Sequence, residues 1–311
     1  MSSSNILVRF EGGIGDCLLG NRLLLAVKEK HPESSIKVVF DTGGNQRQEK
    51  LIKSLWPSIY KDTYTLGDKI NTTHLVPNLK GQLVNDVNHP DNLPSEFKKD
   101  IESSDLYFDL HIASLKFLRY DIPWQKYYNY FPKPEQVKKY EGELPNKFIM
   151  VHLYPRPSNF HSLDQEYSIR LVEELSKILP VVVICQDEYK DWYKGCSDWI
   201  IDPSFEEIFD IASRCEIFFG ADSSIRYTPL HYGKPSFVLS QHCKAPFSVA
   251  GMNLAHMVRW SIFRNHILPP SLDVNVVSKL CSNYLSYPGY YIIPEASDNL
   301  EQIINDSLLV L

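Results

Sequence analysis

The sequence predicts an α/β protein with two similar domains. Residues 6–40 and 215–239 each read as strand, loop, helix, turn and strand. Two strands joined through a helix are usually parallel neighbours in a buried sheet. A new strand at 148–152 follows a polar, proline-bounded segment, as though the fold began again. We therefore expect two Rossmann-like domains, residues 1–140 and 146–311, that face one cleft.

The composition is that of an ordinary globular protein. The chain has 311 residues, of which 43% are hydrophobic and 23% are charged, and its formal net charge is -6. A chain of this length can bury a large core without disulfides or metals. Because the charge balance is acidic, we expect no stable binding to nucleic acid.

The cysteines and the N-terminus indicate the compartment. No two cysteines have the C-x-x-C spacing of a zinc site, so we expect no metal ion. Cys17, Cys185 and Cys215 stand in apolar contexts, as buried free thiols do, so we expect a reducing, cytoplasmic location. The N-terminus lacks the basic and apolar runs of a signal peptide, and no apolar stretch is long enough to span a membrane. Any membrane contact is expected to be peripheral, at the inner face.

The first domain opens with a strand, a glycine-rich turn and a helix. Helical spacing of leucines predicts the helix over 17–30, and the turn before it contains Gly13, Gly15 and Asp16. The further elements expected here are strands at 36–40 and 106–110, a helix at 46–55 and a partly helical, aromatic-rich stretch at 115–130.

The second domain repeats this rhythm after a linker at 132–145. Ser204 and Glu207 have the spacing of a capping box for a helix at 205–214, and Gly233 fits the residue after another helix. The other expected elements are strands at 148–152, 180–185, 199–201, 216–219 and 236–239 and helices at 169–178, 225–232 and 297–311. We expect the last helix to pack back on the first domain.

Asp222, Ser223 and Ser224 stand between a short apolar strand and the next expected helix. A helix that starts at the carboxyl end of a strand points free N–H groups at the crevice where α/β proteins bind ligands. Those groups suit a phosphate or diphosphate, to which the serine hydroxyls and Arg226 would add donors and charge. The alternative is that these side chains only cap a core helix.

Both turns resemble those of one family. The opening I-L-V-R-F-E-G-G-I-G-D-C-L-L-G-N-R-L-L-L-A-V-K-E-K-H-P resembles that of the heptosyltransferases, glycosyltransferase family 9, and the stretch at 215–239 resembles their second signature. The segment D-P-S-F-E-E-I-F-D-I-A-S-R-C-E is similar to the family's preceding helix, and His152 matches in position. The resemblance implies the two-domain GT-B fold and inverting transfer of a sugar from a nucleotide-diphosphate sugar.

In that family, the aspartate after the glycine turn deprotonates the acceptor hydroxyl, and the resemblance gives this role to Asp16. A carboxylate at the start of a helix, on a loop facing the cleft, can accept this proton. Gly13 and Gly15 would let the backbone approach the donor closely. The alternatives are a helix cap for Asp16 and a simple tight turn for the glycines.

The same resemblance places the donor diphosphate at the Asp222 turn. Two positions differ from the family pattern, because Ser224 replaces a glycine and Tyr227 stands where a histidine is common. The family's lysine in the loop after His152 is not evident either, and Arg156 is the candidate to replace its charge. The alternatives are a solvated Arg156 and a hydrogen-bonded core histidine.

Glu188 follows a buried strand at its carboxyl end and could meet a ribose hydroxyl, with a solvated loop as the alternative. We expect a nucleotide sugar as donor, a glycan, lipid-linked sugar or protein as acceptor, and no cofactor. Three other functions stay open: transfer to modified DNA bases by a phage-type enzyme, nucleotide-sugar 2-epimerisation, and non-catalytic binding of a sugar nucleotide or assembly partner. The altered donor positions motivate the last of these.

Overall fold

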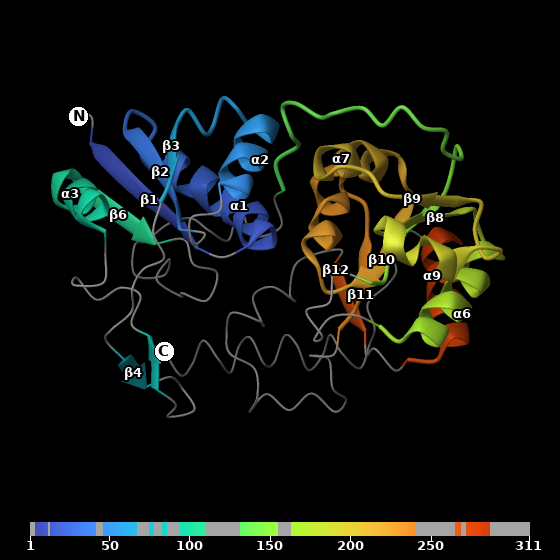
Figure 1. Ribbon diagram of the computed structural model, residues 1–311. Helices are drawn as coiled ribbons and strands as arrows, with labels where there is room; N and C mark the ends of the chain where they lie inside the picture. The colour runs from blue at the N-terminus through green and yellow to red at the C-terminus, as the bar shows by residue number, and fades with distance from the viewer. Residues whose placement is uncertain are drawn as a thin grey trace. The chain divides into compact units, whose positions relative to one another are not determined.

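The computed structural model describes residues 4–11, 13–41, 46–66, 75–77, 83–85, 94–109, 131–154, 163–240, 265–268 and 272–286. The chain divides into two compact units, Met1–Tyr130 and Phe131–Leu311. Each unit contains a parallel sheet with helices between its strands (Figure 1). The predicted α/β class is therefore confirmed.

The first unit is built on a sheet whose described strands run in the order β3-β2-β1-β6, with parallel pairing throughout. Its strands are β1 (Asn5–Glu11), β2 (Ser35–Asp41), β3 (Asp62–Thr65) and β6 (Leu106–Asp109), and its helices are α1 (Ile14–Lys30), α2 (Arg47–Leu55) and α3 (Ser95–Ser103). A separate antiparallel pair joins β4 (Leu75–Pro77) to β5 (Leu83–Asn85). The predicted helical stretch at 115–130 lies outside the described residues.

Helix α1 begins at Ile14, three residues before the predicted start at 17. Gly15 and Asp16 therefore lie in its first turn, and the carbonyl of Gly13 accepts a hydrogen bond from the N–H of Cys17 at 3.1 Å. Acidic residues are stabilised near a helix N-terminus by the helix dipole, so Asp16 favours this earlier start. The glycines at 13 and 15 led to the prediction of a turn here, although Ile14 continues the helical spacing of Cys17 and Leu18.

The second unit is built on a larger sheet in the order β12-β11-β10-β7-β8-β9, again with parallel pairing. Its strands are β7 (Ile149–His152), β8 (Val181–Ile184), β9 (Trp199–Ile201), β10 (Ile217–Ala221), β11 (Ser236–Leu239) and β12 (Asn265–Leu268). Its α-helices are α6 (Gln165–Ser176), α7 (Phe205–Arg214) and α9 (Val274–Ser286). The predicted capping box of Ser204 and Glu207 begins α7.

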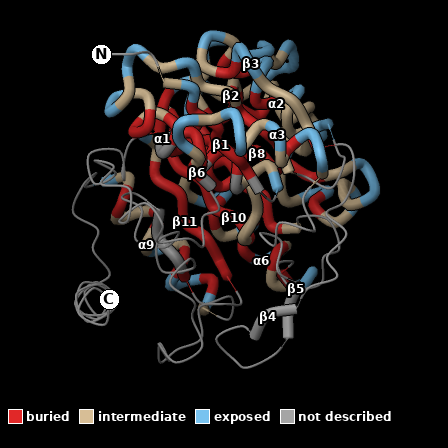
Figure 2. Tube along the Cα trace, turned by 90° about the vertical axis from the view of Figure 1, so that its left-hand side faces the viewer, coloured by how far each residue is buried: buried red, intermediate tan, exposed pale blue. Residues whose placement is uncertain are grey.

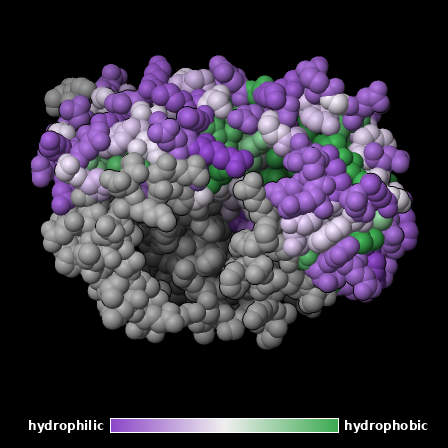
Figure 3. All heavy atoms as spheres, in the orientation of Figure 1, coloured by the Kyte–Doolittle hydropathy of each residue, from purple (hydrophilic) through white to green (hydrophobic). Residues whose placement is uncertain are grey.

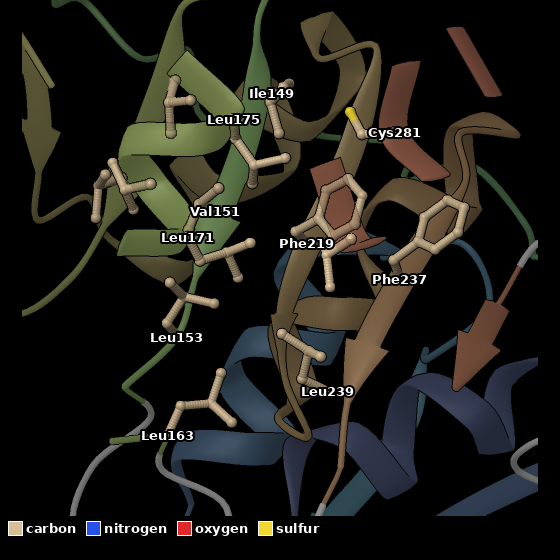
Figure 4. Packing of buried hydrophobic residues seen from close by; sticks show 14 of the residues in the cluster. Ile149, Val151, Leu153, Leu163, Leu171, Leu175, Phe219, Phe237, Leu239 and Cys281 are labelled. Atoms are coloured by element: carbon tan, nitrogen blue, oxygen red, sulfur yellow. The ribbon is translucent and has the colours of Figure 1, made fainter. Parts of the chain in front are cut away.

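Helices cover both faces of the second sheet. Val151 and Phe219 pack with α6 and α9 on one face, as Figure 4 shows, whereas Met150 and Phe218 pack with α7 on the other. Successive side chains of a strand point to opposite faces, so strands buried on both sides are apolar throughout. Strands β10 and β11 are buried along their length (Figure 2), which explains why the sequence revealed them.

The predicted linker at 132–145 is attached to the second unit from its first residues. Phe131 is buried beside His231, with ring centroids 5.2 Å apart. The carbonyl of Pro132 accepts a hydrogen bond from Nδ1 of the same histidine at 2.6 Å. This contact holds the entering chain against a buried side chain that lies 99 residues later in the sequence.

The rest of this segment lies along α7. Lys138 pairs with Glu207 at 2.9 Å, and the N–H of Tyr140 donates to the carboxylate of Asp210 at 3.1 Å. The division into compact units falls between Tyr130 and Phe131, and the predicted domains of residues 1–140 and 146–311 stay a prediction. Polar composition suggested a free linker because the apolar anchors, chiefly Phe131, are few and widely spaced.

The predicted α-helix at 225–232 is instead two short 3-10 turns, η3 (Ser224–Tyr227) and η4 (Pro229–Tyr232). Pro229 has no N–H to donate to the carbonyl of Ile225, as an α-helix would require. The N–H and hydroxyl of Thr228 bond that carbonyl, at 3.0 and 2.9 Å. Gly233 ends the segment with φ 69°, as predicted, because glycine adopts this left-handed conformation without steric cost.

Hydrophilic residues cover most of the described surface in the view of Figure 3. Among the described helices, none combines the length and the apolar character that crossing a bilayer requires. The predicted helix at 297–311, and its packing on the first domain, lie outside the described residues.

Candidate functional site

The carboxyl ends of β7, β10 and β11 meet at one edge of the second sheet. Gly220 of β10 lies opposite His152 of β7, and Ala221 lies opposite Leu239 of β11. The Asp222 turn leaves β10 at this edge. Open α/β sheets bind their ligands outside the carboxyl ends of parallel strands, so this edge is the candidate site.

His152 and Ser223 meet here. The distance from Nδ1 of His152 to Oγ of Ser223 is 3.1 Å. His152 is only 8% exposed, and burial lowers the pKa of its imidazole to about 4. The ring is therefore neutral near pH 7, and the Ser223 hydroxyl is held by a partner that carries no charge.

Asp222 and Arg226 form an ion pair across the same turn. The distance from Oδ1 to Nη1 is 2.9 Å, and the Arg226 side chain is fully buried. The guanidinium also donates to the hydroxyl of Tyr227 and lies over its ring, 4.5 Å from the centroid. On the other side, the hydroxyl of Ser240 reaches the second oxygen of Asp222 at 3.4 Å. Asp222 thus joins the ends of β10 and β11.

This arrangement differs from the predicted one. No side-chain hydrogen bond caps η3, because Asp222 faces Arg226 and Ser223 faces His152. Ser224 is the first residue of η3 and is half-buried. A single 3-10 turn has a much weaker dipole than the α-helix expected there, so charge attraction at this turn rests on individual N–H and hydroxyl groups.

Gly220 allows the two central strands to approach. A Cβ atom at this position would lie 2.7 Å from the carbonyl oxygen of His152 and 2.3 Å from the ring of Phe218. Neither can give way easily, since one is backbone and the other belongs to a fully buried ring. A side chain at this position would therefore displace the backbone of His152 or the ring of Phe218.

Glu188 lies at the same edge, after β8. It is the second residue of the 3-10 helix η2 (Asp187–Tyr193) and is exposed. Its hydrogen bond to the hydroxyl of Tyr189 raises the pKa of that phenol to about 12. Tyr189 in turn packs against Tyr154 and Trp192, with ring centroids 4.4 and 5.2 Å away. These three aromatic residues were not predicted, although two of them follow a buried strand at a spacing of one helical turn.

Three predicted residues belong to the first unit. Gly13 is exposed at the bend before α1, and Gly15 is half-buried in its first turn. The backbone of Asp16 lies in that turn, and its side chain lies outside what the structure describes. Arg156 also lies outside the described residues. The roles of these residues stay predictions.

The first unit also contains a buried ion pair that sequence reasoning missed. Nε of Arg9 donates to Asp41 Oδ2 at 3.1 Å, and the Arg9 side chain is almost fully buried. Its guanidinium lies 5.7 Å from the ring centroid of Phe97. The pair joins β1 to β2 near their carboxyl ends; its only signal in the sequence was a charged residue inside an apolar strand.

Solved structures with the same fold include known glycosyltransferases. The chain is similar to E. coli ADP-heptose LPS heptosyltransferase II, with 12% identity, a TM-score of 0.52, and coverage of 91% of this chain and 98% of that chain. A glycosyl transferase of family 9 from Veillonella parvula DSM 2008 gives 12% identity and a TM-score of 0.50 over 100% of this chain and 99% of that one. The fold is of the GT-B type.

This chain also matches a UDP-N-acetylglucosamine 2-epimerase, with 11% identity and a TM-score of 0.45 over 92% of this chain and 88% of that one. No family model matches the sequence, and no curated protein does. Likeness at these identities establishes the fold, and function has to be inferred from the site. Among the residues that the structure describes, no group of three or more His, Cys, Asp or Glu side chains could hold a metal ion.

Proposed function

We propose that the protein is an inverting glycosyltransferase that transfers a sugar from a nucleotide-diphosphate sugar to an acceptor hydroxyl. The observation that carries the proposal is the turn after β10. In a fold that solved glycosyltransferases share, this turn presents Ser223 and Ser224 at the carboxyl edge of the sheet, beside His152. We propose a glycan, lipid-linked sugar or protein as the acceptor, and the cytoplasmic location stays a prediction.

The turn after β10 would hold the diphosphate. The hydroxyls of Ser223 and Ser224 and the first two N–H groups of η3 can donate to phosphate oxygens and stabilise the charge that develops as the nucleoside diphosphate leaves. Arg226 is buried and paired with Asp222, so we assign both residues to holding the turn in place. This changes the roles expected from the sequence, in which both contacted the donor directly.

Asp16 would act as the general base. In the proposed step, its carboxylate takes the proton of the acceptor hydroxyl while the hydroxyl oxygen bonds to the anomeric carbon of the donor. The bond from that carbon to the diphosphate breaks with its electron pair, and the configuration at the carbon inverts. Support comes from the position of Asp16 in the first turn of α1, after the exposed Gly13.

A screen followed by one matched pair of variants tests this function. A panel of ADP-, UDP-, GDP-, CDP- and dTDP-linked sugars is titrated while the unfolding temperature is followed, since a bound donor stabilises the folded state. With the donor found, release of nucleoside diphosphate is measured in the presence of acceptors. We expect Asp16→Asn to keep donor affinity and lose transfer, and Glu29→Gln, at the other end of α1, to keep both. Undiminished transfer by Asp16→Asn would remove the base assignment.

A non-catalytic sugar-nucleotide binder is the second candidate. It is favoured by Tyr227, which replaces the family's histidine and is buried against Arg226. A side chain held in this way cannot approach a donor without breaking that contact. Donor binding without nucleotide release, for every acceptor tried, would select the binder over the enzyme. The acidic net charge disfavours the DNA-modifying alternative, and epimerisation of the free donor would reveal the isomerase.

A further inference from the structure

Three aromatic side chains gather at the carboxyl edge of the second sheet. The ring centroid of Tyr154 lies 4.4 Å from that of Tyr189 and 4.8 Å from that of Trp192, and the latter two are 5.2 Å apart. We call these residues the aromatic cluster. Their rings meet at tilted or edge-to-face angles, so no two of them stack face to face.

The order of the strands puts this cluster beside the Asp222 turn. Tyr154 lies two residues after His152, at the end of β7, and the other two rings belong to η2, which follows β8. Strand β7 lies between β10 and β8. The Asp222 turn follows β10, so the proposed diphosphate site and the aromatic cluster lie at neighbouring strand ends on the same edge of the sheet.

The cluster is not simply a part of the core. Tyr193, in the same 3-10 helix, is 0% exposed and belongs to the core of the unit. Tyr154, Tyr189 and Trp192 are half-buried, and the last two only pack against that core from outside. The carboxylate of Glu188 accepts a hydrogen bond from the hydroxyl of Tyr189, and Glu188 is exposed. An exposed carboxylate therefore lies beside the aromatic cluster.

We propose that the aromatic cluster binds the base of the nucleotide donor. A purine or pyrimidine ring stacks on the face of Trp192 or Tyr154, and the carboxylate of Glu188 accepts from the ribose hydroxyls between the base and the diphosphate. Base–aromatic stacking tolerates any base because every base has a π-face. This inference rests on the proposed function, since it assumes that a nucleotide binds at this edge.

The test compares two ligands that differ only in the base. Affinity of the full chain is measured for a nucleoside diphosphate (the tightest of ADP, GDP, UDP and CDP) and for ribose 5-diphosphate, which has the same sugar and phosphates. We expect Trp192→Leu and Tyr154→Leu to lower the affinity for the nucleoside diphosphate by about 10- to 100-fold. The affinity for ribose 5-diphosphate should stay nearly unchanged. Trp199→Leu is the matched control, because Trp199 is half-buried on β9 and packs with the other face of the sheet.

Fluorescence gives a readout that does not depend on stability. Stacking on the indole should quench the emission of Trp192 when the nucleoside diphosphate binds, and Trp192→Phe, which keeps an aromatic ring, should lose that quenching but retain most of the affinity. If Trp192→Leu and Tyr154→Leu lower the affinity for both ligands equally, or lower neither, the base site is overturned and the transferase proposal stays intact. If neither ligand binds the unaltered chain, the proposed function itself fails and the base site with it.

Discussion

His152 at the end of β7 and Ser223 after β10 meet at 3.1 Å, although 71 residues separate them in the sequence. They meet because β7 and β10 are adjacent parallel strands whose carboxyl ends lie level, with His152 opposite Gly220. A neutral, buried imidazole thus fixes the hydroxyl that we propose for the diphosphate.

Removing the Ser223 hydroxyl should destabilise the protein. In Ser223→Ala, Nδ1 of the buried His152 loses its partner, which costs about 1–3 kcal/mol of unfolding free energy. Urea denaturation measures the change. Ser213→Ala is the control, since the Ser213 hydroxyl bonds a helix carbonyl that is already used by the helix, and its loss should matter little. A Ser223→Ala protein as stable as the control would show that the contact with His152 contributes nothing.

Asp222 and Arg226 should behave as a coupled pair. Asp222→Ala leaves a fully buried guanidinium without its carboxylate and should cost about 3–5 kcal/mol of unfolding free energy. Arg226→Met combined with Asp222→Ala should cost less than the sum of the single changes, which a double-mutant cycle detects. The exposed pair Lys194–Asp191 is the matched control and should show coupling near zero.

This coupling affects how nucleotide binding is assayed. A loss of affinity in Asp222→Ala would follow from a displaced turn as well as from a lost ligand contact. If the double variant recovers stability and retains its affinity for the nucleotide, the two residues hold the turn in place, as we propose. Additive costs in the cycle would instead mean that the two side chains act independently.

The protein should lose stability as the pH falls through the range from about 6.5 to 4. Burial lowers the pKa of His152 and of His231 to about 4 in the folded state, although the Pro132 carbonyl partly opposes this at His231. The unfolded chain, with histidine pKa values near 6.5, binds protons in this window that the folded chain does not. Each histidine therefore adds a slope of at most about 1.4 kcal/mol per pH unit, and stability is highest above the window.

Denaturant titrations at a series of pH values measure this slope. His231→Leu should flatten it by up to one proton, even if its stability at pH 7 is lower, because the variant has one fewer group to protonate on unfolding. His31, which is only half-buried, provides the comparison: His31→Leu should change the slope less. An unchanged slope in His231→Leu would mean that His231 is not buried in its neutral form.

The second unit should need residues 131–145 to be stable. A fragment of residues 131–311 retains the packing of Phe131, Tyr140 and Leu144 on the unit, whereas a fragment of 146–311 loses it. Burial of one large apolar side chain contributes about 1.5–3 kcal/mol, so we expect the longer fragment to be more stable by at least about 2 kcal/mol. Equal stability of the two fragments would show that residues 131–145 add nothing to the stability of the second unit.

Phe131→Ala and Val137→Ala in the full chain complement the fragments. Phe131 is 8% exposed and Val137 is 38% exposed. We expect the first change to cost about 3–5 kcal/mol, as for other buried phenylalanines, and the second to cost little. Similar effects of both would mean that the segment is not anchored through Phe131.

Several elements could be predicted from the sequence because their signals are local. Strands β7, β8, β10 and β11 are short, mostly apolar runs, and the capping box of Ser204 and Glu207 lies within one turn. The predicted α-helix at 225–232 was wrong because Pro229 outweighs the apolar pattern around it. The start of α1 was misplaced because Gly13 and Gly15 indicate a turn, although Ile14 already belongs to the helix.

The sequence by itself determined the fold class, the strands β1, β2 and β6 to β11, and the two turns that carry the candidate residues. Apolar periodicity and helix capping depend only on residues that are close in the sequence, so both can be recognised without coordinates. Only the tertiary structure decided the partners: Arg226 for Asp222, His152 for Ser223, and Tyr154 for the rings of η2. Parallel strands bring distant segments to one edge, and which side chains pair there depends on strand order and register, which no local pattern encodes.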